Sequence, residues 1–92
     1  MDIQQAVGEA VRHFRIGGHG KNKPSYTQEQ LTEMVRRLSR ETEAKGAVAP
    51  ETISRIENGH VNPTIRQIDW ICQALDVSLV EFFRYVESKR KS

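Results

Sequence analysis

The chain has 92 residues, of which 37% are hydrophobic and 28% charged, and its formal net charge is +2. This length and composition predict one ordinary globular domain, and they exclude a disordered polypeptide or an enzyme with a separate regulatory lobe. Because the sequence has no apolar run of membrane-spanning length, no signal-peptide layout and a single cysteine, we expect a cytoplasmic protein with no internal disulfide.

An apolar stripe predicts the first helix. After Asp2, a suitable N-cap, apolar residues recur at three- and four-residue intervals: Ile3, Ala6, Val7, Ala10, Val11 and Phe14. The stripe ends at "GGHGKNKPS", residues 17–25, whose glycines, proline and lysines predict an exposed loop. Lys21 and Lys23 in this loop could meet phosphates, although a solvated loop explains them equally well.

A second helix is predicted from Thr27 through "TQEQLTEMVRRL", with an apolar face made of Leu31, Met34, Val35 and Leu38. The third predicted helix starts at Pro50, which suits a first helical turn, and stops at Asn58 and Gly59. Thr64 is expected to cap a fourth helix with Ile65, Ile68, Ile71, Cys72 and Leu75 inward. Ser78 is expected to cap a fifth, "SLVEFFRYVES", before a basic tail.

These segments predict an all-α fold: a compact five-helix bundle, with one domain over residues 1–88 and a basic tail over residues 89–92. The three histidines and Cys72 lack metal-ligand spacing, and Cys72 is best read as a core residue. No arrangement of a nucleophile and a base suggests catalysis. We therefore expect no enzyme, no cofactor and no metal.

The third predicted helix raises the functional question. Only Ile53 and Ile56 are apolar in its "PETISRIEN", so the opposite face is either simply solvated or directed at a partner. The net charge of +2 and the sequence pI of about 8.9 permit nucleic-acid binding but are too mild to indicate it alone.

Four stretches in order carry a resemblance: "VGEAVRHFR", "YTQEQL", "TISRIENGHVNPT" and "ICQALDVSLVEFF". Together they resemble the helix-turn-helix DNA-binding domains of the phage-repressor, Cro-like family, also called the XRE family, over most of residues 7–83. The resemblance implies a five-helix bundle whose second and third helices form the DNA-binding unit, with the third in the major groove of double-stranded DNA.

The resemblance also implies residue roles. Base-reading positions of the family correspond to the start and middle of the third helix, where Arg55 can bond bidentately to guanine and Glu51 could both accept from cytosine and pair with Arg55. Phosphate contacts are implied for Gln28, for the loop after the third helix and for the amides from Thr64 to Arg66. The full expected DNA-binding set is Gln28, Pro50, Glu51, Thr52, Ser54, Arg55, Asn58, His60, Asn62 and Thr64.

Arg15 and Glu57 match a family ion pair that joins the first and third helices, so the resemblance gives them a structural role. Two features depart from the family. Pro50 stands where many relatives carry a polar base-reading side chain. The segment 36–48 enlarges the connection between the two helices of the motif by about ten residues over the usual 3–4. Leu38 and Thr42 at helical spacing, with Gly46 as a stop, predict that the second helix continues by two to three turns.

The predicted function is a sequence-specific transcriptional regulator, a repressor or controller, that binds an inverted-repeat operator as a homodimer. The expected dimer interface lies on the fourth and fifth helices, at Trp70, Phe83, Tyr85 and Val86, with Trp70 pointing partly outward. The alternative interpretation is that Trp70 packs over the edge of the bundle and Tyr85 closes the core. The alternative function is an antitoxin or another protein-interaction module that uses the same fold to bind a protein partner.

Overall fold

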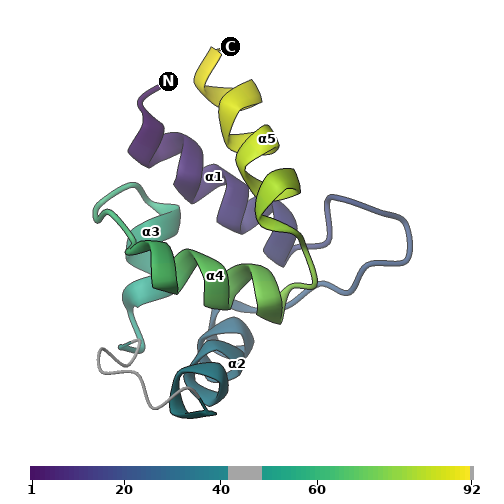
Figure 1. Ribbon diagram of the computed structural model, residues 1–92, viewed down its shortest axis with the longest axis vertical. Coiled ribbons are helices and arrows are strands. Elements are labelled where there is room, and N and C mark those ends of the chain that lie inside the picture. Colours follow the sequence, from purple (N-terminus) through teal and green to yellow (C-terminus); the bar gives the residue numbers. More distant parts are fainter. Residues whose placement is uncertain (42–48, 92) are drawn as a thin grey trace.

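Five α-helices make up the described part of the chain, residues 1–41 and 49–91 of the computed structural model (Figure 1). They are α1 (Ile3–Arg15), α2 (Gln28–Glu41), α3 (Thr52–Glu57), α4 (Ile65–Ala74) and α5 (Leu79–Lys91). Within those two ranges there is no strand, so the predicted all-α, five-helix class is confirmed. No helix there is long and apolar enough to cross a membrane.

The helices pack in two groups that share α3. In Figure 1, α1 and α5 lie together at the upper end, α4 crosses the middle, and α2 lies at the lower end. α1 packs on both α5 and α3, whereas α2 packs on α4 and α3. The short α3 is therefore held from two sides, and its remaining side forms one flank of the molecule.

Local sequence signals explain where the helices begin and end. The caps predicted for α4 and α5 are confirmed at Thr64 and Ser78, and Thr27 caps α2 in the same way by accepting the Gln30 N–H at 3.0 Å. At α4 the capping is reciprocal: the Thr64 hydroxyl accepts the Gln67 N–H at 3.1 Å, and the Gln67 side chain accepts the Thr64 N–H at 3.0 Å. Asp2 occupies the N-cap position of α1 but makes no side-chain capping bond.

The predicted stop of α3 is also confirmed. Gly59 has φ of +71°, which glycine adopts without strain, and its N–H donates to the Ile56 carbonyl at 3.1 Å. The His60 N–H donates to the Arg55 carbonyl at 2.9 Å. These two bonds form a Schellman motif, which satisfies carbonyls that the helix end would leave without partners. Its start is shifted, because Pro50 and Glu51 form a turn before the first helical residue, Thr52.

The core follows the predicted apolar faces. Its least exposed large side chains include Leu31, Val35, Ile53, Ile56, Ile71 and Phe82. The rings of Phe14 and Phe82 join α1 to α5 with a centroid separation of 5.9 Å. Ile3 and Ile65 were predicted inward but are 50% and 68% exposed. Each lies in the first turn of its helix, and the buried stripe begins one turn further along.

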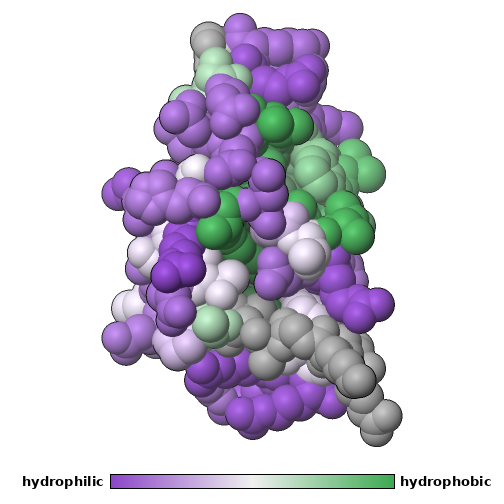
Figure 2. Space-filling model, turned by 90° about the vertical axis from the view of Figure 1, so that its left-hand side faces the viewer, coloured by the Kyte–Doolittle hydropathy of each residue, from purple (hydrophilic) through white to green (hydrophobic). Residues whose placement is uncertain are grey.

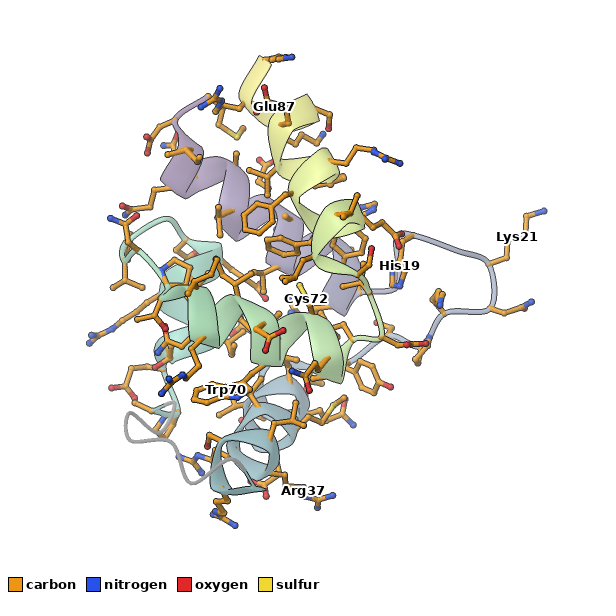
Figure 3. The ribbon with its side chains drawn as sticks, viewed as in Figure 1. His19, Lys21, Arg37, Trp70, Cys72 and Glu87 are labelled. Carbon is orange, nitrogen blue, oxygen red and sulfur yellow. The ribbon has the colours of Figure 1, made fainter. Side chains whose placement is uncertain are left out.

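The expectation that Trp70 points outward is wrong. Its side chain is only 3% exposed. Figure 3 shows it directed from α4 toward α2, the two helices that pack on each other at this end of the molecule. α2 continues to Glu41, which is the part of the predicted two- to three-turn extension that the described residues include. Thr42, which was expected to continue the helical spacing, and Gly46, which was expected to end the extension, lie outside the described residues.

Two other expectations about the C-terminal region need correction. Val86 is 3% exposed and belongs to the core, so it cannot contribute an interface side chain without unfolding. The tail expected from residue 89 is helical, because α5 continues through Lys91. Arg90 and Lys91 pair with Glu87 at 3.5 Å and 3.3 Å, and positive side chains favour a helix C-terminus.

Candidate nucleic-acid interface

The short helix α3 has one buried and one accessible side. Ile53 is 0% and Ile56 1% exposed, so these two side chains fix the helix to the core. Glu51 and Arg55 are exposed on the other side, and Thr52 is partly exposed beside them. Figure 2 looks onto the flank on which α3 lies and shows a largely hydrophilic surface there. The α3 face can therefore meet a polar partner without rearrangement of the core.

The predicted ion pair between Arg15 and Glu57 is present. Arg15 Nε lies 2.6 Å and Nη2 2.8 Å from the two carboxylate oxygens of Glu57, which makes the pair bidentate. The Glu57 side chain is 4% exposed and that of Arg15 13%. The hydrogen bond to Glu57 raises the pKa of Arg15. Because Arg15 Nη1 also donates to the Tyr26 carbonyl at 2.9 Å, the guanidinium joins α1, the loop before α2 and α3.

Gln28 takes part in this same network. Its side-chain Nε2 donates to Glu57 Oε1 at 3.1 Å, so one acceptor holds both Arg15 and Gln28. The first residue of α2 is thereby held beside the last residue of α3. Sequence reasoning assigned Gln28 only to a phosphate contact, and the structure adds a positioning bond to that expectation.

The remaining expected contact residues surround α3. Asn58, His60 and Asn62 are exposed in the turn that follows it. Asn58 Nδ2 lies 3.4 Å from the Ser54 hydroxyl oxygen. Among the described residues no ion pair links Glu51 to Arg55, so the expected pairing of these two side chains is absent from the free protein. Arg55 is left accessible to a partner.

Of the backbone amides expected to bind an anion at the start of α4, one is already used. The Thr64 N–H donates to the Gln67 side chain within the capping box. Of the expected amides, those of Ile65 and Arg66 in the first turn of α4 are left for an anion. Arg66 is itself exposed, so its guanidinium can add to the positive character of this helix end.

The lysines of the 17–25 loop lie elsewhere. Figure 3 shows Lys21 at the opposite side of the molecule from α3. Lys23 Nζ lies 3.9 Å from the Asp76 carboxylate, after the end of α4. A ligand on the α3 face would therefore not meet these two lysines at the same time.

Cys72 is 2% exposed, and burial raises its thiol pKa to about 12, so it behaves as a core residue. No group of three or more histidine, cysteine, aspartate or glutamate side chains could hold a metal ion in residues 1–41 and 49–91.

Sequence reasoning missed Gln4, whose side-chain amide donates to the Gly59 carbonyl at 2.5 Å across a separation of 55 residues. The signal was available, because Gln4 lies four residues before Gly8 and eleven before Arg15. This spacing places all three on one face of α1. A glycine inside a helical pattern is a further indication of close packing.

The comparison with protein families agrees with this geometry. The helix-turn-helix family matches residues 22–82, which is more than half of the chain and includes α2, α3, α4 and the first part of α5. No curated protein and no solved structure matches the sequence. Of the four stretches that carry the resemblance to the phage-repressor, Cro-like domains, two lie inside this range and a third ends one residue beyond it, and the match supports that resemblance. The chain therefore belongs to the XRE type of the helix-turn-helix family, whose members are DNA-binding regulators of transcription.

Proposed function

We propose that this protein binds specific operator sequences and represses or controls transcription by occupying them. The observation that carries the proposal is the division of α3 into a buried edge, Ile53 and Ile56, and an accessible polar face that includes Thr52 and Arg55. The major groove admits a helix and presents a different donor and acceptor pattern for each base pair. An exposed polar helix held firmly by its other side suits that groove.

Arg55 is proposed as the main base-reading residue. A guanidinium can donate two hydrogen bonds to guanine O6 and N7, and Arg55 is exposed with no acidic partner recorded within the described ranges. Thr52 and Glu51 are proposed to read neighbouring bases. Pro50, exposed in the turn before α3, lacks a polar side chain and can contribute only van der Waals contact.

Phosphate contacts are proposed for the residues at the two ends of the motif. Gln28 keeps its amide oxygen and one amide hydrogen for a phosphate or water after bonding Glu57. The turn residues Asn58, His60 and Asn62, and the first turn of α4 after Thr64, are proposed to contact the same or the facing strand. Such contacts set the register of the protein on DNA without reading sequence.

Arg55→Ala tests the base-reading assignment. Binding of the variant to the operator selected from random DNA should weaken by about 1–3 kcal/mol, and the preference for guanine at one position should be lost. Arg84→Ala is the matched control, because Arg84 is exposed on α5 and also carries one positive charge. If Arg55→Ala and Arg84→Ala bind the operator with the affinity and preference of the wild type, α3 does not read bases through Arg55.

A further inference from the structure

Gly8 lies where α1 comes closest to α3. It is buried in the middle of α1. A Cβ at this position would overlap the Ile56 carbonyl oxygen and would stand 2.9 Å from that of Glu57. Both obstacles are backbone atoms of the last turn of α3, so no side-chain rotation could relieve them. Glycine costs about 0.5–1 kcal/mol relative to alanine inside a helix, which makes a packing reason for its presence here necessary.

Two side chains from the same face of α1 hold the neighbouring part of α3. Gln4 Nε2 donates to the Gly59 carbonyl at 2.5 Å, one turn before Gly8 along α1. Arg15 holds the Glu57 carboxylate in the bidentate pair, about two turns after it. The three contacts all act on residues 56–59, whereas Thr52 lies at the other end of α3 and Arg55 lies in its last turn, next to Ile56.

Because α3 has only six residues, a shift of its C-terminal end displaces the whole helix. We infer that Gly8 is a positioning residue for DNA reading: its missing side chain sets how closely the C-terminal end of α3 docks on α1, and thereby the direction in which the polar face is presented. Gln4 supports the same placement. This inference rests on the proposed reading of bases by α3. If the inference holds, Gly8 of α1 influences sequence preference through the placement of α3 and not through a contact of its own with DNA.

Gly8→Ala tests the inference, together with Gln4→Ala and the control Ala10→Gly. Ala10 is fully buried in the same helix but is turned by about 200° from Gly8, so its loss should destabilise the core without displacing α3. Each protein is titrated with the operator selected by the wild type and with a scrambled duplex, and its folded fraction is measured by circular dichroism.

Gly8→Ala should weaken operator binding by about tenfold, comparable to one mismatched base pair, while binding to the scrambled duplex changes by less than about threefold. Gln4→Ala should lower the ratio of operator affinity to scrambled-duplex affinity by a smaller factor. If Gly8→Ala does not fold, this ratio in Gln4→Ala tests the inference in its place. Ala10→Gly, corrected for its folded fraction, should leave the ratio unchanged.

An unchanged ratio in a folded Gly8→Ala protein, or in Gln4→Ala if Gly8→Ala is unfolded, would overturn the inference. A ratio that falls equally in Ala10→Gly would also overturn it, because the effect would then follow from lost stability. Failure of the wild type itself to prefer any sequence would instead contradict the proposed function.

Discussion

Glu57 shows how one side chain can link the elements of a small domain. Its two carboxylate oxygens accept hydrogen bonds from Arg15 of α1 and Gln28 of α2, while its backbone carbonyl lies against Gly8. The ionic part of this arrangement could be predicted from the sequence, since Arg15 and Glu57 match a known pair of the family. The bond from Gln28 could not be predicted, because it depends on the angle at which three helices meet. The glycine inside α1 indicated close packing at Gly8 but not that α3 would be its partner.

His13 provides a residue-scale prediction about pH. Its ring stacks on Tyr85 of α5 with a centroid separation of 4.1 Å and an angle of 14°. Burial lowers the pKa of His13 below its ordinary value of 6.5, nearby His19 and Lys89 lower it further, and Glu81 acts in the opposite direction. The unfolded chain therefore binds a proton at His13 at a higher pH than the folded protein does.

It follows that the stability linked to His13 is fully present above pH 6.5 and is lost as the pH falls through the folded-state pKa. The thermal midpoint of the wild type should drop more between pH 8 and pH 5.5 than that of His13→Gln, measured by circular dichroism. His60→Gln, which changes an exposed histidine, should follow the wild type. Parallel curves for the wild type and His13→Gln would show that burial of this ring has no effect on stability.

Among the elements, α2 departs most from the family pattern. Trp70 of α4 bears on the role of α2, because its side chain is directed toward that helix. The sequence predicted that α2 continues past the usual turn, because Leu38 kept the helical period, and the structure confirms its continuation to Glu41. The same reasoning misplaced Trp70. Periodicity put it between two inward residues of α4, but an indole is wide enough to be buried beside that stripe when a second helix lies alongside.

Trp70→Ala should therefore destabilise the monomer. Removal of a buried aromatic side chain typically costs about 3–5 kcal/mol, so the urea midpoint should fall markedly. Phe83→Ala is the control, since Phe83 is 36% exposed and its removal should cost far less. If Trp70→Ala keeps wild-type stability, the packing of α4 on α2 does not depend on this side chain.

At the scale of the whole molecule, the surface of α5 suggests how two copies could associate. Leu79, Val80 and Phe83 are 39%, 67% and 36% exposed and share one face of the helix. We propose a second copy as the occupant of this surface, because one recognition helix contacts too few base pairs to be selective in a genome.

The double variant Val80→Glu with Phe83→Glu should be a folded monomer by sedimentation, with greatly weakened operator binding. Both side chains are accessible, so the charges disturb an interface and not the core. Ser88→Glu adds a charge to α5 outside the face that carries Leu79, Val80 and Phe83, so this control variant should remain dimeric. A double variant that sediments as an unchanged dimer would contradict the assignment of this surface. If the double variant instead keeps operator binding but no longer binds a protein partner that the wild type binds, the antitoxin-like alternative is favoured.

Family and helix order could be predicted from sequence because they depend on local periodicity, caps and turn residues such as Thr64 and Gly59. The buried state of Trp70 and the bond between Gln28 and Glu57 could not, because they arise where segments far apart in sequence meet. Base contacts remain a prediction, since they depend on DNA geometry that neither the sequence nor the free protein contains.

Selection of bound duplexes from a random DNA library by the wild-type protein tests the central claim most directly. The account predicts enrichment of two half-sites in inverted orientation, with centres about 10–10.5 base pairs or a multiple apart, and a guanine in each whose preference disappears in Arg55→Ala. No enrichment over the starting library, under salt conditions where the protein binds DNA at all, would contradict the account.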